Sequence, residues 1–180
     1  MEYKFLKINE YQYKNVVENI EMSVYTLVSF LLPVFIGHPQ IIVGIAVNAI
    51  LIMAALNLKG YKVLPVIIAP ALGALMRGIL FGPFTIYLVY LIPFIWIGNA
   101  ILVFSFRWLK VRMNKNYFLT LIVGAVTKSG FLFLIAFLLF RLEIIPAIFL
   151  TSMGVLQLST ALIGGVGAYF IQFAREKIIN

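Results

Sequence analysis

The stretch that decides the fold is Tyr117–Phe140, YFLTLIVGAVTKSGFLFLIAFLLF, an apolar run long enough to cross a lipid bilayer as one helix. A single charged residue, Lys128, lies near its middle. At about 1.5 Å of rise per residue, Lys128 is roughly 16 Å from one end of the run and 19 Å from the other. A lysine side chain does not easily reach the membrane surface over that distance. We therefore expect its ammonium group to face protein, water or a ligand.

The composition of the whole chain is that of an integral membrane protein. Of its 180 residues, 63% are hydrophobic and 11% are charged, and the mean hydropathy is +1.08. Soluble domains are usually about half apolar and about a quarter charged. The length allows about six spans of roughly 20 residues each, which leaves no room for a soluble domain. We expect a single transmembrane domain over residues 1–180, an all-α bundle of six helices in the cell membrane.

Five short turns, three of which contain glycine or proline and two of which are charged, divide the chain into six apolar segments. Residues 1–20 are polar and mixed in charge, and the spacing of their few apolar residues suggests a short interfacial helix that leads into the membrane. The most basic turn covers 107–116. The expected spans are about 22–36, 40–58, 63–80, 84–106, 117–140 and 144–173.

The basic residues predict the orientation of the bundle, because short loops rich in Lys and Arg remain in the cytoplasm. With six spans, both termini and the second and fourth turns fall on one side, which carries eleven Lys and Arg residues. The opposite side carries only Arg141. We therefore expect both termini to be cytoplasmic and the three outer turns to be very short. The eleven residues are Lys4, Lys7, Lys14, Lys59, Lys62, Arg107, Lys110, Arg112, Lys115, Arg175 and Lys177.

Four of the six expected spans carry a strong hydrogen-bonding side chain near the middle of the membrane. These side chains are Asn48, Asn99, Lys128 and Gln157. Each has a simple structural interpretation, because amides often join transmembrane helices at about 0.6 kcal/mol each, and a lysine can bond Asn, Gln and backbone carbonyls. All six glutamates fall in the expected tails or loops, and the chain has no aspartate. A carboxylate partner for Lys128 is therefore missing, which favours a functional role.

Two further residues extend this set towards the outer side. Arg77 lies about 6 Å from the outer end of its span, where it either reaches the membrane surface or faces a site. Trp96 lies one turn outward from Asn99 and is too deep for an interfacial aromatic, so it is either a core residue or a stacking wall. Taken together, the six residues describe an outward-facing substrate pocket. Arg77 and Lys128 would hold a carboxylate or phosphate, the amides would recognise ring edges, and Trp96 would stack.

Other kinds of chemistry lack the residues they need. The chain has no Cys and one His, and no hydrolase, phosphate-loop or dinucleotide motif occurs in a usable context. We expect no catalytic residues, no metal site and no cofactor, so the chain is not expected to be an enzyme. Nucleic acid is an unsuitable partner because the positive charge does not form one soluble face. No Asp, Glu or His lies in an expected span, so transport would have to be driven by another protein.

These features together resemble the substrate-binding membrane subunit, or S-component, of energy-coupling factor (ECF) transporters. The resemblance covers the whole chain through its six spans, inward termini, short outer turns, polar outward pocket and lack of a motor. Two segments are similar to that family, His38-Pro39-Gln40 with Gly44 and Asn48, and Leu80-Phe81-Gly82-Pro83-Phe84. The resemblance implies vitamin uptake, with a small water-soluble, vitamin-like substrate. It also implies a transmembrane coupling subunit that carries two ATPases as the partner.

Two other functions remain open at the level of the sequence. The first is a structural or accessory subunit of a larger membrane complex, which predicts no cavity and large exposed faces of small residues. The second is an oligomeric anion channel or exporter. In that case Lys128 and Arg77 would line a pore shared between copies.

Overall fold

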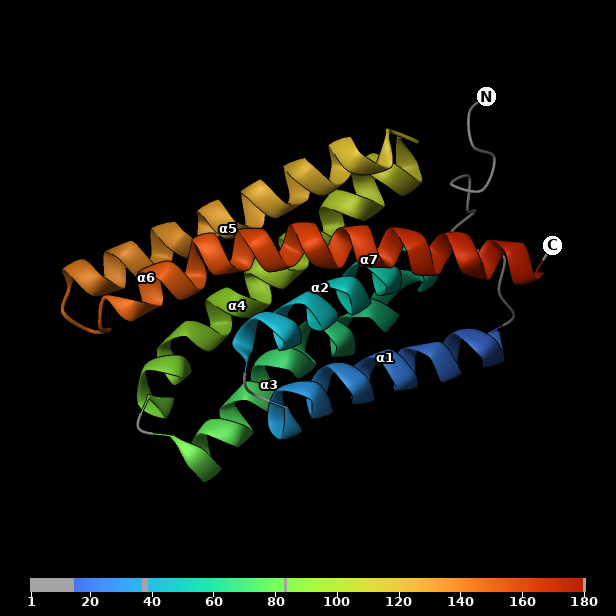
Figure 1. Ribbon diagram of the computed structural model, residues 1–180. Coiled ribbons are helices and arrows are strands. Elements are labelled where there is room, and N and C mark those ends of the chain that lie inside the picture. Colours follow the sequence, from blue (N-terminus) through green and yellow to red (C-terminus); the bar gives the residue numbers. More distant parts are fainter. Residues whose placement is uncertain (1–14, 37–38, 83, 180) are drawn as a thin grey trace.

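The computed structural model of the protein describes residues 15–36, 39–82 and 84–179. These residues form helices and turns without any strand, and six of the helical segments are long and apolar enough to cross a membrane (Figure 1). This confirms the expected all-helical fold and supports a multi-pass membrane protein. The elements are α1 (Asn15–Phe35), α2 (Gln40–Asn57), the 3₁₀ turn η2 (Gly60–Val63), α3 (Leu64–Phe81), α4 (Thr85–Ser105), the π-helix η3 (Phe106–Arg112), α5 (Tyr117–Arg141), α6 (Ile148–Met153) and α7 (Val155–Ile179).

The first and fourth helical segments differ most from the expected spans at the basic end of the bundle. Residues 1–14 of the expected interfacial segment lie outside the described residues, and 15–20 already belong to α1. The fourth segment was expected to end at 106, but it continues as η3 to Arg112. Arg107 makes this continuation possible by donating to the carbonyl oxygens of Leu58 (2.7 Å) and Gly60 (2.8 Å), so its charge is satisfied while the backbone stays helical.

The sixth span is interrupted, which the sequence pattern did not predict. Instead of one helix over 144–173, the chain forms the short α6, breaks at Gly154 and continues as α7 to Ile179. Gly154 has φ −95° and ψ −97°, outside the helical region. A Cβ at this position would lie 2.8 Å from the Phe133 ring and 2.9 Å from the Leu150 carbonyl oxygen. Glycine therefore permits both the break and the close contact with α5.

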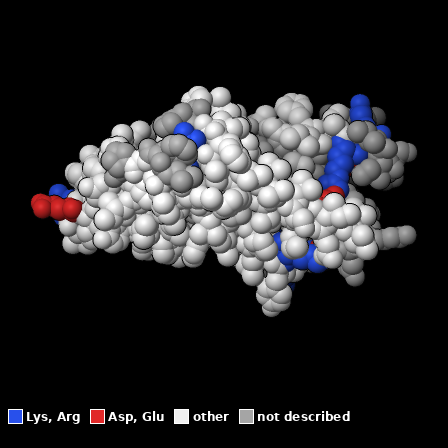
Figure 2. All heavy atoms as spheres, turned by 90° about the horizontal axis from the view of Figure 1, so that it is seen from below, with Lys and Arg blue, Asp and Glu red and all other residues white. Residues whose placement is uncertain are grey.

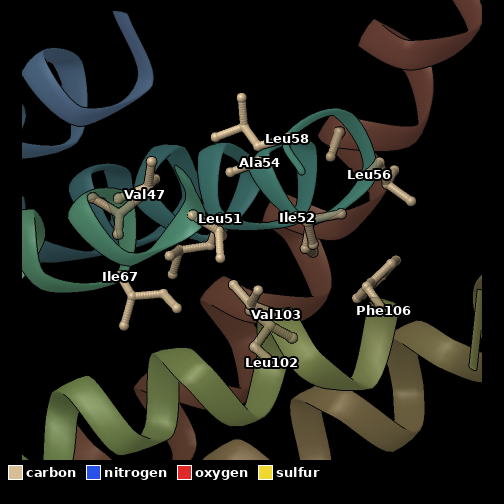
Figure 3. Packing of buried hydrophobic residues seen from close by; sticks show 14 of the residues in the cluster. Val47, Leu51, Ile52, Ala54, Leu56, Leu58, Ile67, Leu102, Val103 and Phe106 are labelled. Carbon is tan, nitrogen blue, oxygen red and sulfur yellow. The ribbon is translucent and has the colours of Figure 1, made fainter. Parts of the chain in front are cut away.

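The helices pack in pairs around α2 and α4. Helix α1 lies against α3, α2 against α7, and α5 against α4 and α7. Figure 1 shows α1 and α3 side by side at one side of the bundle and α5 at the other. Between them, Leu51 and Ile52 of α2 face Leu102 and Val103 of α4, and all four side chains are fully buried (Figure 3).

One end of the bundle is joined by charged and amide side chains. The carboxylate of Glu18 is fully buried and accepts hydrogen bonds from the backbone N–H of Lys59 and from Lys62 Nζ, the latter at 2.8 Å. Glu21 pairs with Arg175 of α7. The expectation that every glutamate lies in a tail or loop is therefore wrong for Glu18, Glu21 and Glu176, because α1 begins early and α7 extends to Ile179.

The surface charge agrees with this arrangement. Figure 2 shows most of the visible Lys and Arg side chains at the end where α1 begins and α7 ends in Figure 1. The turns η2 and 113–116 lie at the same end, because each joins the ends of helices that return to it. The basic residues are thus concentrated at one end of the molecule, as the loop pattern indicates.

Glycines allow two pairs of helices to approach backbone to backbone. A Cβ on Gly73 would overlap the carbonyl oxygen of Phe30, and a Cβ on Gly164 would overlap that of Ile45. Such contacts stabilise helix pairs in lipid, where van der Waals packing replaces the hydrophobic effect as the driving force.

We expect Gly73→Ala and Gly164→Ala to lower the thermal unfolding midpoint of the purified protein, because the added methyl groups must push the helices apart at a cost of about 1–3 kcal/mol. Gly130→Ala is the matched control, because no atom lies within 4 Å of a Cβ placed there. This variant should be unchanged or more stable, by up to about 1 kcal/mol. Equal effects at all three positions would contradict close packing at Gly73 and Gly164.

Candidate functional site

A cavity of about 600 Å³ lies inside the bundle. Residues from all six membrane-length segments line it, including Pro33 of α1, Pro70 of α3 and Lys128 of α5. Its lining extends to the end of the bundle that bears Gln40 and Phe84, where α2 and α4 begin. The volume falls in the range of about 300–1,000 Å³ that is usual for sites of small molecules.

The structure brings five of the six candidate residues to this cavity. Asn48, Arg77, Asn99, Lys128 and Gln157 all contribute to its wall, although they come from five different helices. Their similar depth was apparent from their positions within the spans. The structure adds that they face one common space, and whether they bind a substrate there stays a prediction.

Lys128 is held by two amide oxygens. Its side chain is 1% exposed, and Nζ donates to Asn48 Oδ1 at 2.6 Å and to Asn99 Oδ1 at 2.9 Å. An ammonium group carries three N–H donors. Two of them have acceptors among the described residues, which leaves one for another partner.

The two asparagines are in turn fixed by neighbouring helices. Asn48 Nδ2 donates to the Gly44 carbonyl oxygen (2.9 Å) and to Thr160 Oγ1 (3.1 Å). Asn99 Nδ2 donates to the Ile67 carbonyl oxygen (3.1 Å). The amide N–H groups therefore point away from the ammonium, and both amide oxygens must face it. This hydrogen-bond network joins α2, α3, α4, α5 and α7.

The positive charge of Lys128 has only neutral partners within the described part of the chain. No Asp or Glu occurs among the described residues that line the cavity. Two ion pairs between described residues, Glu18 with Lys62 and Glu21 with Arg175, both lie near the opposite end of the bundle. The described wall therefore carries basic side chains and no acidic one, which favours an anionic occupant.

Arg77 and Trp96 lie differently from the rest of the set. Arg77 lines the cavity nearer the end of the bundle where α2 and α4 begin, and it donates from Nη1 to the Val34 carbonyl oxygen at 3.1 Å, which ties α3 to α1. Trp96 does not occur among the described residues of the wall, and its Nε1–H donates to the Ile68 carbonyl oxygen at 3.2 Å. The structure thus places Trp96 against α3 rather than as a stacking wall. The indole N–H needs an acceptor when it is partly buried, and that carbonyl supplies one.

Sequence reasoning did not identify Gly44 and Thr160 as members of this site. A Cβ on Gly44 would lie 2.8 Å from Thr160 Cγ2, so the glycine lets α7 come close enough for Thr160 to bind Asn48. The signal was present, because Gly44 lies one turn before Asn48, and Thr160 follows Gln157 by three residues. Comparison of the chain with protein-family models, curated proteins and solved structures gave no match.

A double-mutant cycle tests the contact between Lys128 and Asn99. We expect Asn99→Leu to destabilise the protein by about 1.5–3 kcal/mol, because it removes an acceptor from a buried charge. In a Lys128→Met background the same change should cost less, with a coupling energy of about 0.5–3 kcal/mol. Thermal or denaturant unfolding in one detergent measures all four proteins. Asn57→Leu, whose amide partner is Gln172 near the other end, is the control and should be additive with Lys128→Met. If the destabilising effects of Asn99→Leu and Lys128→Met were additive, the contact between the two side chains would be contradicted.

Proposed function

We propose that the protein is the membrane-embedded substrate-binding subunit of an uptake transporter for a small organic anion. The observation that carries the proposal is the environment of Lys128. This buried lysine has neutral amides as its acceptors and lies on the wall of a cavity of about 600 Å³. The described lining of that cavity contains no acidic residue. A buried charge without a counter-charge is costly. A bound anion supplies that counter-charge and accepts the remaining N–H of the ammonium.

The proposal includes a direction and a source of energy. The concentration of basic residues at the other end of the bundle supports cytoplasmic termini, so the cavity would face outward. Small molecules would enter from outside and be released inward when the protein cooperates with a transmembrane coupling subunit and its two ATPases. This part of the proposal is drawn from the resemblance to S-components of ECF transporters.

The cavity favours this function over the two alternatives. An accessory subunit is expected to have a filled interior, which a cavity lined by all six spans does not support. An oligomeric anion channel requires Lys128 on a surface shared between copies. The side chain is instead 1% exposed within a single chain and is bonded to α2 and α4 of that same chain.

The orientation is testable because the chain contains no cysteine. Met113 and Leu142 are exposed at opposite ends of α5, so Met113→Cys and Leu142→Cys provide single reporters. We expect a membrane-impermeant maleimide to label Leu142→Cys in intact cells and Met113→Cys only after the cells are permeabilised. The unsubstituted chain is the control for background labelling. The reverse pattern would overturn the proposed orientation.

Native mass spectrometry of the protein purified from cells in its membrane lipids tests the binding function. We expect wild-type protein to retain a small anionic molecule and Lys128→Met to lose it, because the charge-assisted contact is removed. Lys110→Met is the matched control, because Lys110 is also a buried lysine but bonds the Lys115 carbonyl oxygen outside the cavity. Retention of the same molecule by Lys128→Met, or its loss from both variants, would count against a site at Lys128.

A further inference from the structure

The hydroxyl groups on the cavity wall are already committed to the helices that carry them. Thr85 Oγ1 donates to the Gly82 carbonyl oxygen (2.8 Å), Ser152 Oγ to that of Ile148 (3.2 Å) and Thr160 Oγ1 to that of Leu156 (2.8 Å). A hydroxyl has one proton to donate. None of the three therefore has a donor left for a ligand.

The asparagine amides are committed in the same way. Both N–H bonds of Asn48 Nδ2 have acceptors, Asn99 Nδ2 is bonded to α3, and both Oδ1 atoms accept from Lys128. They hold the lysine in place rather than recognising the edges of a ring. Gln157 and Gln40 differ, because both line the cavity and no hydrogen bond of the described residues involves their side-chain amides.

The rest of the described wall is mainly apolar, and it separates the two cations. Arg77 lies ten residues beyond Ile67 on α3, or about 15 Å along the helix, whereas Ile67 is bonded to the asparagine that holds Lys128. The backbone positions that carry the two cations are thus separated along the bundle, and we place the anionic group at Lys128, which has an N–H to donate. The apolar side chains of the wall include Val43, Val47, Leu88, Ile95, Phe149 and Leu156.

From this inventory we infer the class of substrate: an organic anion with a largely apolar body. Its carboxylate accepts the remaining N–H of Lys128, its body packs on the apolar wall, and the amides of Gln157 and Gln40 bond a few further polar groups. A ligand with many hydroxyl groups is disfavoured, because the described wall offers few N–H or O–H donors to their oxygen atoms. This inference rests on the proposed binding function and narrows it.

Three probes of similar length separate the contributions of charge and apolar body. They are 3-phenylpropionate, an anion with an apolar body, 3-phenyl-1-propanol, its neutral analogue, and gluconate, a hydroxyl-rich anion. Calorimetric titration of the full chain in lipid nanodiscs measures their affinities. We expect 3-phenylpropionate to bind at least about tenfold more tightly than either of the others, because only it satisfies both the ammonium and the apolar wall.

The same titrations on variants locate the site. Lys128→Met should abolish the preference of the protein for 3-phenylpropionate over the alcohol, whereas Lys110→Met should retain it. Asn99→Asp provides a second variant in case Lys128→Met does not fold, which circular dichroism reveals. Its carboxylate supplies an internal counter-charge beside the ammonium and should weaken 3-phenylpropionate by at least about tenfold.

The outcomes distinguish the inference from the function on which it rests. Tighter binding of gluconate than of 3-phenylpropionate, lost in Lys128→Met, would overturn the apolar substrate class while the anion-binding function stands. The same result follows if native mass spectrometry identifies a Lys128-dependent, hydroxyl-rich anion while all three probes fail to bind. Failure of every probe together with no co-purified anion would overturn both.

Discussion

The structure depends on how a lysine ammonium is accommodated in the middle of a membrane-length helix. Lys128 is held by Asn48 of α2 and Asn99 of α4, and each amide is oriented by an acceptor on a further helix, Thr160 of α7 or Ile67 of α3. Removing any member leaves a buried polar group without its partner, which costs more than the bond itself contributes. The relative positions of α2, α4 and α5 are therefore constrained by one charge. The same side chain also makes the wall of the cavity basic.

Packing on both sides of this network preserves the empty space beside it. Close backbone contacts at Gly73 and Gly164 draw α3 to α1 and α7 to α2. The break at Gly154 separates α6 from α7, and residues of both helices contribute to the wall. Pro33 and Pro70 also lie on the wall, and a proline inside a helix leaves a carbonyl without its usual donor and bends the helix. Tight contacts around the cavity thus coexist with irregular helices that line it.

The fold and much of the site could be predicted from the sequence, because the position of a residue within a span indicates its depth in the membrane. Asn48, Asn99, Lys128 and Gln157 lie at similar depths, and the cost of buried polar groups directs all four inward. The hydrogen-bond partner of each side chain could not be predicted from the sequence. Lys128 donates to Asn48 and Asn99, Trp96 donates to α3, and Arg107 donates to the 58–60 turn, because each donor meets an acceptor on an element distant in sequence.

The same network links the stability of the apo protein to the binding of an anion. Two amide oxygens solvate the ammonium less well than water does. Burying it therefore lowers the free energy of unfolding, and other interactions in the folded protein must offset that loss. An anion that reaches the remaining N–H offsets that cost only in the folded protein, where the three side chains meet. Ligand at a hundredfold excess over its Kd would add about 2.7 kcal/mol of stability. An internal carboxylate in place of Asn48 or Asn99 would recover part of this energy without any ligand, but would neutralise the charge that Lys128 offers to the cavity. Under the proposed function, the absence of acidic residues from the described wall keeps that charge available to an anion.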